Sequence, residues 1–323
     1  MAGPETELGP VPTLAGVEGR SPRELIVTRF KRDKFAIAGL IFLAIVMVLA
    51  FGAPLIAKAV GHGPNDNTYL REMTYENGLP KGPNFSLKFY FGADRAGRDL
   101  FVRVAYGART SLIVAFFATG ISVVIGVTAG LLAGFYRGKV DTFVSRTIDV
   151  VYSLPILLLS LGLVSACSAT RQGCAGGLLK PGLFMVSLVI GLFSWPYIAR
   201  IVRGQVLSLR EKEFIEASRA QGGSDFRIIF REVLPNVAAP IIVYTTLIIP
   251  NNILFEAALS FLGVGIQDTT PSWGRMLNDA NAVFRVAWWT MVFPGVFLFL
   301  TTLAFNLVGD GLRDALDPKT VKE

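Results

Sequence analysis

Residues Gly204 to Asn236 have the sequence GQVLSLREKEFIEASRAQGGSDFRIIFREVLPN, a polar, helix-prone segment between two apolar runs. Its first part, Glu211 to Gln221, is rich in good helix formers and has no proline or glycine, which predicts a helix. Gly222 and Gly223 predict the end of that helix, because successive glycines can adopt the left-handed geometry that closes one. This pattern indicates the first arm of a helical hairpin.

A second arm is expected directly after the glycines. Ser224 or Asp225 offers a side-chain oxygen that can cap a new helix. The helix should run to about Leu234, where Pro235 lacks a backbone donor and is expected to turn the chain back toward the membrane. The two arms together predict a hairpin that lies outside the lipid.

The charge of this hairpin is balanced. Its cations are Arg210, Lys212, Arg219, Arg227 and Arg231, and its anions are Glu211, Glu213, Glu216, Asp225 and Glu232. A lipid-binding segment would instead carry an excess of cations. Apolar residues interleave with the charges, namely Phe214, Ile215, Phe226, Ile228, Ile229 and Phe230. Apolar anchors with a charged rim favour a surface that docks on a protein, and a solvated connecting loop is the alternative.

The composition of the whole chain is that of a membrane protein. Its 323 residues are 52% hydrophobic and 17% charged, with a mean hydropathy of +0.52, because six long runs carry no charge. The net charge of +7 does not indicate nucleic-acid binding, since the cations flank the apolar runs instead of forming one stripe. No removable signal peptide is expected, because the first apolar run is too long and lacks a cleavage site.

The apolar runs predict an all-α membrane protein with six transmembrane helices. The expected parts are a cytoplasmic tail and lead-in (1–34, disordered to 21), a first transmembrane helix (35–57), an extracellular segment (58–109), a core (110–309) and a cytoplasmic tail (310–323). The five core spans are expected at 110–136, 149–166, 181–199, 233–255 and 286–309. Cations beside the first span place the N-terminus in the cytoplasm, and an even number of spans places the C-terminus there too.

Two of these spans carry signals about packing. The second span contains small residues at four- or six-residue intervals, Gly120, Gly126, Gly130 and Gly134, which predict a closely packed helix. The third span contains Pro155, which is expected to kink it near the inner leaflet.

The fifth span is the predicted pore-lining helix. It contains Pro250, Asn251 and Asn252, and a proline inside a membrane helix frees carbonyls that a polar neighbour can satisfy. Glu256 follows near the outer end. An ionisable group at that depth is a candidate functional residue, but a structural bond to backbone amides or to a cation is favoured.

Polar clusters in two other places are expected to be structural. Asp94, Arg98 and Asp99 in the outer segment can bond one another to fix an extracellular cap, and simple solvation of all three is the alternative. Arg146 and Asp149 are about one turn apart and are expected to form an ion pair in preference to a proton relay.

Metal and redox chemistry have few candidate residues. Cys167 and Cys174 are the only cysteines; they fall in an external loop where a disulfide is permitted, and free thiols are the open alternative. The single histidine, His62, has no neighbouring ligand cluster, and two cysteines cannot complete a zinc site, so no metal is expected. No phosphate-binding Gly-x-x-x-x-Gly-Lys-Ser/Thr loop occurs, so ATP should not bind to this chain.

The hairpin resembles the Glu-Ala-Ala loop of transmembrane subunits of ATP-binding-cassette (ABC) importers. The matching frame is Glu216-Ala217-Ser218, then Gly222, then Leu234-Pro235. Ser218 replaces an alanine of that frame and Glu232 stands where it prefers isoleucine; both departures are mild. Three further blocks, at 91–112, 256–277 and 305–318, resemble the second permease of dipeptide, oligopeptide and nickel importers, in order over most of the chain.

This resemblance implies a type I ABC importer permease, with no catalytic residues, in the cell membrane of a prokaryote. It implies a homologous permease as dimer partner, two cytoplasmic ATPase subunits that bind ATP and magnesium, and an extracellular substrate-binding protein. The implied ATPase-coupling residues are Glu213, Glu216, Ala217, Ser218, Gly222, Gly223, Leu234 and Pro235. The expected substrates are di- or oligopeptides.

Three alternatives to this function remain open at this point. A permease of the same family could carry nickel, glutathione or an oligosaccharide. An ion-driven secondary transporter would need paired carboxylates at mid-membrane and inverted repeats, and the sequence offers only Asp149 and Glu256 near the edges. Nothing in the sequence favours a membrane scaffold without transport.

Overall fold

The computed structural model describes residues 22–316 except 170–172, 175, 177–178 and 267–268. The predicted disorder of residues 1–21 and the last part of the predicted cytoplasmic tail, 317–323, lie outside this range. The described residues form helices joined by loops, with isolated β-bridges but no strand among them. This architecture confirms the predicted all-α class.

Helices follow one another along the whole of the described chain. They are α1 (Pro22–Arg32), α2 (Lys34–Phe51), α3 (Ala53–Val60), α4 (Leu70–Met73), α5 (Leu100–Tyr136), α6 (Gly138–Ser153), α7 (Ile156–Ser168), α8 (Leu183–Leu209), α9 (Glu213–Ala220), α10 (Asp225–Ile228), a π-helical turn (Ile229–Val233), α11 (Leu234–Phe261), α12 (Trp273–Ala280) and α13 (Trp289–Leu316).

Five helical segments are long and apolar enough to cross a membrane: α2, α5, α8, the segment 225–261 that contains α11, and α13. The pair α6 and α7 passes the same test together but bends by 81° at its break, as a broken span or a re-entrant loop does. The described residues therefore hold five spans, or the predicted six when the bent pair is counted as one. The third of them is not the single helix expected at 149–166, because the chain leaves helical geometry at Leu154 and Pro155, whose backbones are extended.

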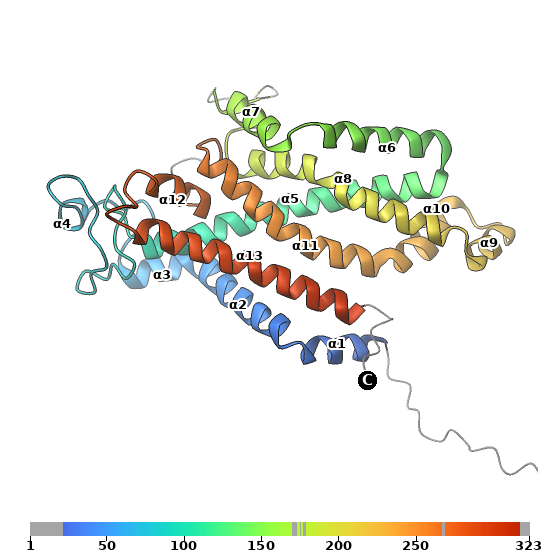
Figure 1. Ribbon diagram of the computed structural model, residues 1–323, viewed down its shortest axis with the longest axis horizontal. Coiled ribbons are helices and arrows are strands. Elements are labelled where there is room, and N and C mark those ends of the chain that lie inside the picture. Colours follow the sequence, from blue (N-terminus) through green and yellow to red (C-terminus); the bar gives the residue numbers. More distant parts are fainter. Residues whose placement is uncertain (1–21, 170–172, 175, 177–178, 267–268, 317–323) are drawn as a thin grey trace, which may run out of the picture.

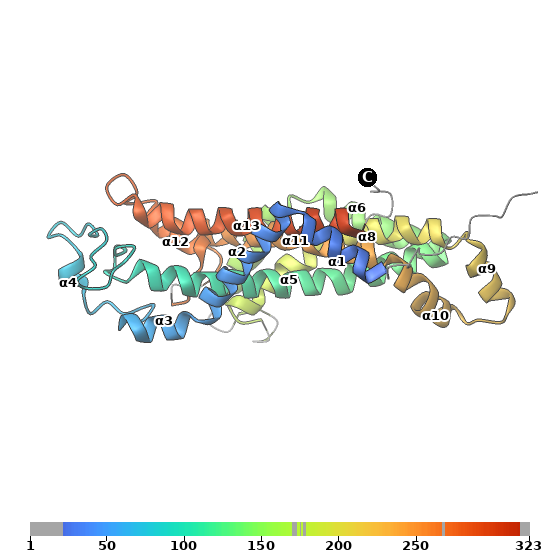
Figure 2. The ribbon, with the colours of Figure 1, turned by 90° about the horizontal axis from the view of Figure 1, so that it is seen from below.

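The long helices lie side by side along one axis (Figure 1). The short outer elements α3, α4 and α12 gather at one end of the bundle, and α9 and α10 project from the other end in both views (Figures 1 and 2). The described chain ends, α1 and the last turn of α13, lie on the hairpin side of the bundle centre. The hairpin and both chain ends are thus on the same side, as the predicted topology requires.

The centre of the bundle is the contact between α5 and α8, where the α5 glycines face α8. A Cβ built at Gly130 would lie 2.7 Å from the carbonyl oxygen of Ala199, and one at Gly134 would lie 2.6 Å from the Cβ of Val206. Only glycine allows the two backbones to approach this closely. The predicted close packing is confirmed for these two residues and for Gly126, where a Cβ would lie 2.8 Å from the carbonyl oxygen of Trp195, whereas a Cβ at Gly120 would meet open space.

Local capping fixes where two helices begin. The carboxylate of Asp33 accepts hydrogen bonds from Phe35 N and Ala36 N at 2.9 and 3.1 Å, so α2 starts directly after this residue. Asp99 does the same for α5, which then continues without a break for 37 residues. The last ten residues of the predicted extracellular segment, 100–109, and the predicted second span are therefore one helix.

Candidate functional site

The predicted hairpin is present at the inner end of the bundle (Figure 1). Its first arm is α9, slightly shorter than the helix predicted for 211–221. Its second arm begins at Asp225, after Ser224 at the N-cap position. The Ser224 side chain makes no capping hydrogen bond, so that part of the prediction was wrong.

The turn between the arms depends on its two glycines. Gly222 has a φ of +81°, which is the left-handed conformation that L side chains rarely adopt. Its N–H donates to Arg219 O at 2.9 Å, and the N–H of Gly223 donates to Ser218 O at 3.0 Å. A Cβ at Gly223 would lie 2.8 Å from that Ser218 oxygen. Gly222 is therefore needed for backbone conformation and Gly223 for close approach.

The apolar residues of the hairpin divide into an inner and an outer set. Ile215, Ile228 and Ile229 are buried against residues of α5, α8 and α11, in one core cluster with Val206 and Val237. The phenylalanines face outward: the exposed fraction is 40% for Phe214, 72% for Phe226 and 49% for Phe230. The isoleucines join the hairpin to the bundle, and the phenylalanines leave an aromatic surface that no described residue covers.

Polar contacts tie the base of the hairpin to the end of α5. Arg137 pairs with Glu211, and Arg210 donates to the carbonyl of Phe135. The guanidinium of Arg219 lies over the Phe135 ring at 5.2 Å. These contacts make it difficult for the hairpin to move without the inner end of α5.

The predicted coupling residues lie mainly on the free surface of the hairpin. Exposed are Glu213, Glu216, Ala217, Gly222 and Pro235, and partly buried are Ser218, Gly223 and Leu234. Within the described part of the chain, the carboxylates of Glu213 and Glu216 make no hydrogen bond or ion pair. Both charges are therefore available to a partner.

Pro235 does not turn the chain back, as the sequence had predicted. It occupies the first turn of α11, where its missing N–H removes no intrahelical bond. The π-helical turn Ile229–Val233 joins α10 to α11, so 225–261 is a continuous helical segment. Such π-turns are frequent at functional sites. The second arm of the hairpin is thus the inner end of a membrane-spanning helix.

This helix carries polar contacts in the middle of the bundle. The amide nitrogen of Asn252 donates to Thr119 Oγ1 at 2.9 Å, and its oxygen accepts from Ser194 Oγ at 3.1 Å. Glu256 is completely buried and accepts hydrogen bonds from Ser111 and Ser260 at 2.8 and 2.7 Å. One helix therefore connects the exposed hairpin to buried polar groups on α5 and α8.

The predicted pore residues are not equally placed. Pro250, Asn252 and Glu256 are buried inside the chain, whereas Asn251 is exposed. The expectation that Glu256 bonds backbone amides or a cation was wrong, because serine hydroxyls are its partners. A pore-lining role stays a prediction, and Asn251 alone presents its side chain on an outer surface of the bundle.

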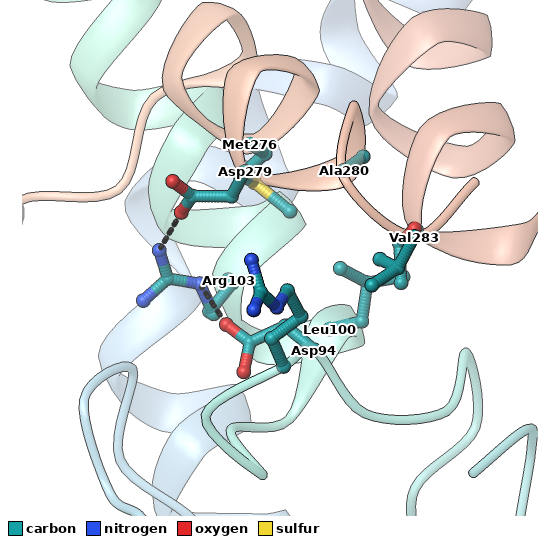
Figure 3. Close-up of a pocket in the computed structure, with 9 residues that line it drawn as sticks. Asp94, Leu100, Arg103, Met276, Asp279, Ala280 and Val283 are labelled. Atoms are coloured by element: carbon teal, nitrogen blue, oxygen red, sulfur yellow. Dashed lines mark ion pairs between the residues drawn. The ribbon is translucent and has the colours of Figure 1, made fainter. Parts of the chain in front are cut away.

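A second polar cluster lies at the outer end, between the outer segment and α12. Arg103, with a side chain only 1% exposed, lies between Asp94 at 3.3 Å and Asp279 at 3.9 Å (Figure 3). Arg98 contacts the same two carboxylates, at 2.7 and 3.6 Å. Burial raises the pKa of Asp279, and the guanidinium groups of Arg275, Arg103 and Arg98 oppose this shift. The cluster fastens the outer segment to α12.

The prediction for this cap was correct for Asp94 and Arg98 and wrong for Asp99. Asp99 is buried and bonds His62 Nδ1 at 2.9 Å instead. Burial raises the pKa of Asp99, and its hydrogen bonds with His62 and with the backbone N–H groups of α5 oppose the shift. The contribution of Arg103 to the cap was not predicted, although a single charged residue within the apolar run 100–108 could have indicated a buried ion pair. Asp279 was not predicted either, and it has no local signal.

Two smaller predictions concern Cys167 and Asp149. The structure joins Cys167 and Cys174 in a disulfide, the first of the two alternatives. Arg146 and Asp149 approach to 4.0 Å as expected, and Arg200 of α8 is a second partner for Asp149, at 3.6 Å. Within the described residues, no group of three or more His, Cys, Asp or Glu side chains could hold a metal ion.

The sequence of residues 126–322 matches the model of the binding-protein-dependent transport system inner membrane component family. The chain belongs to this family. Residues 21–76 also match the N-terminal transmembrane domain of oligopeptide transport permease C. The permease is therefore a multi-pass inner-membrane subunit of an ABC importer, as the resemblance implied.

Individual relatives cover nearly the whole permease. The dipeptide transport system permease protein DppC of Alkalihalophilus pseudofirmus is 41% identical over 299 residues, 93% of this chain and 90% of its own. The oligopeptide transport system permease protein OppC of Haemophilus influenzae is 39% identical over 94% of this chain and 90% of its own. The glutathione transport system permease protein GsiD of Escherichia coli O157:H7 is 40% identical over 97% of this chain and 95% of its own.

Solved structures support the fold of the permease. A chain of the MetNI methionine ABC transporter in an inward-facing conformation superposes with a TM-score of 0.55 at 21% identity. The match covers 68% of this chain and 96% of the other. At this identity the likeness concerns the fold alone, which is that of type I ABC importer permeases.

Proposed function

We propose that this permease moves di- or oligopeptides into the cell, driven by ATP hydrolysis in partner subunits that dock on the hairpin of α9 and α10. The observation that carries the substrate class is similarity to relatives that are named for dipeptide, oligopeptide and glutathione transport. All three substrates are peptides, and each relative matches over nine tenths or more of this chain.

The proposed coupling step uses the exposed surface of the hairpin. Glu216 forms a charge-assisted contact with the ATPase, Ala217 allows close approach, and Gly222 sets the turn. The exposed rings of Phe226 and Phe230, 4.5 Å apart, provide the apolar anchor that a docking surface needs. This coupling requires no ATP site in the permease; ATP and magnesium bind the partner.

Movement passes from the hairpin to the bundle along two connections. The buried isoleucines and the contacts with Phe135 carry it to α5 and α8. The continuous helical segment 225–261 carries it to Asn252 and Glu256. Closure of the ATPases would therefore rotate these helices together and alternate access to a central path.

The proposed assembly contains a homologous permease, two ATPase subunits and an extracellular substrate-binding protein. Glutathione is itself a peptide, so transport of glutathione is a case of the same function. Among described residues no metal-binding group favours nickel.

The test is uptake of a labelled dipeptide by proteoliposomes that contain the complete importer. Uptake should require ATP and the ATPase subunits, and a proton or sodium ionophore should leave it unchanged. Glu216→Gln should weaken uptake, and Asp310→Asn, which removes an exposed carboxylate from the inner end of α13, should not. Uptake that continues without the ATPases and stops with the ionophore would contradict the proposal.

A further inference from the structure

Arg200 on α8 is a charged residue on an exposed surface of a membrane-spanning helix. Its side chain is 59% exposed, its guanidinium carbon lies 4.8 Å from the centre of the Tyr152 ring, and one nitrogen lies 3.6 Å from Asp149 Oδ1. These are its side-chain interactions among the described residues. A guanidinium has five N–H donors, so most of them remain available to a ligand.

The depth of Arg200 can be estimated from the contact between α5 and α8. Gly130 on α5 packs against the carbonyl of Ala199, so Arg200 is level with Gly130. A hydrocarbon core of ~30 Å corresponds to about 20 helical residues, and centred on the charge-free part of α5 it covers roughly 113–133. By this estimate Gly130, and with it Arg200, lies about three residues, or ~5 Å, inside the inner edge of the core, directly after the end of the span predicted at 181–199.

An exposed ion pair at this depth is not expected to face lipid. Charged side chains in membrane spans are costly in lipid and almost always face protein or a water-filled path. Arginine can extend toward the interface, but the short side chain of Asp149 cannot. The surface that carries both charges is therefore expected to face the central path or the homologous permease of the proposed assembly, and not lipid.

Three tyrosines, each on a different helix, lie on or near the surface that carries Arg200. Tyr197, one turn before Arg200 on the same face of α8, is 45% exposed, and Tyr152 on α6 is 42% exposed. The ring of Tyr197 packs edge-on against Tyr244 of α11, 6.0 Å away. A cation and an anion among tyrosines match the chemistry of a peptide, which has a carboxylate, an ammonium group and side chains.

We propose that Arg200 binds the C-terminal carboxylate of a peptide in transit, with Tyr152 and Tyr197 flanking it. This inference rests on the proposed function and names the part of the substrate that the path recognises. Arginine suits the task because its planar N–H groups can hold both carboxylate oxygens. Asp149 competes for the same guanidinium, which limits how tightly the peptide is held and lets it leave.

The experiment compares variants of the complete importer in proteoliposomes, with uptake of labelled alanyl-phenylalanine and ATP hydrolysis stimulated by the loaded binding protein as separate readouts. Arg200→Gln should reduce uptake about tenfold or more, because a charge-assisted hydrogen bond is lost, while stimulated hydrolysis stays within about twofold. Arg200→Lys, which keeps the charge, should retain an intermediate rate. The matched control is Lys139→Gln, an exposed cation on α6 away from Asp149, which should not change uptake.

A second arm tests the carboxylate itself. The C-terminal amide of the same dipeptide is supplied at a concentration that saturates the binding protein. The wild-type importer should move the amide slowly, and Arg200→Gln should not slow it further. The proposal would be overturned if Arg200→Gln slowed uptake of the dipeptide and of its amide equally, or if it left uptake of the dipeptide normal. It would also be overturned if Arg200→Gln and Arg200→Lys both lost stimulated ATP hydrolysis together with uptake. A wild-type importer that takes up neither peptide would instead refute the proposed function.

Discussion

Substitutions at Gly222 test whether the shape of the hairpin turn controls coupling to the ATPase. A Cβ at this position would meet no atom within 4 Å, so the cost of alanine is confined to the backbone at φ +81°. For an L residue in this conformation the cost is about 1–2 kcal/mol, which corresponds to about a 5–30-fold change in the population of the turn. Asparagine tolerates the conformation and should cost less.

The assay measures dipeptide uptake, ATP hydrolysis and recovery of the ATPase with the purified permease. Gly222→Ala should reduce the amount of ATPase that purifies with the permease, and the rate of dipeptide uptake, by about 5–30-fold. Gly222→Asn should stay close to wild type in both. Gly222→Asp has nearly the same shape as the asparagine variant but adds a negative charge at the tip, and it should abolish uptake while assembly remains measurable. Gly204→Ala, in open space on α8, is the control.

Two results would refute this reasoning. Unchanged transport by Gly222→Asp would remove the hairpin from the mechanism. Equal damage by alanine and asparagine at position 222 would show that the left-handed backbone is not the cause.

Other variants test the packing, the buried carboxylate and the outer cap. Gly130→Ala should lower the free energy of unfolding by about 1–3 kcal/mol, because its Cβ would press on the α8 backbone. Gly120→Ala, whose Cβ would meet open space, should not lower it, and thermal denaturation in detergent compares the two variants. Glu256→Gln should keep near-normal stability, because an amide can still bond the two serine hydroxyls, and Glu256→Ala should lose about 1–3 kcal/mol; equal losses would contradict the described hydrogen bonds. Asp99→Asn should raise the melting temperature of the permease at pH 8. Burial raises the pKa of Asp99, so its ionised carboxylate destabilises the fold at this pH, and asparagine removes that charge while it can still cap α5. This gain should shrink as the pH falls through the raised pKa and the wild-type carboxyl takes up its proton, and a gain that grows on acidification would contradict it.

Most of the fold could be predicted because the membrane restricts the choices. Each charge-free run had to become a helix, since the backbone has no other partner in lipid. The glycines of α5 also carried a direct signal, because small residues on one face allow close approach. Gly222 was predictable for the same local reason: few residues other than glycine adopt the turn that ends α9.

The errors arose where local rules did not determine the outcome. Pro155 predicted a kink but not a bend of 81°. Pro235 resembled a helix breaker, yet at the start of α11 it has no intrahelical bond to remove. The contact of Arg103 with Asp279 joins segments far apart in the sequence, and only the folded bundle brings them together. Glu256 has two partners: Ser260, one turn along the same helix, was open to prediction from its spacing, whereas Ser111 on α5 has no pattern of its own.

A single cysteine in the hairpin gives the most direct test of the central claim that this surface docks on the cytoplasmic ATPase. The only two native cysteines are joined to each other, so Ala217→Cys would add the sole free thiol at an exposed site. We expect a membrane-impermeant maleimide to label this thiol in inverted vesicles but not in intact cells, and the assembled ATPase to protect it. Labelling in intact cells, or equal labelling with and without the ATPase, would contradict the account.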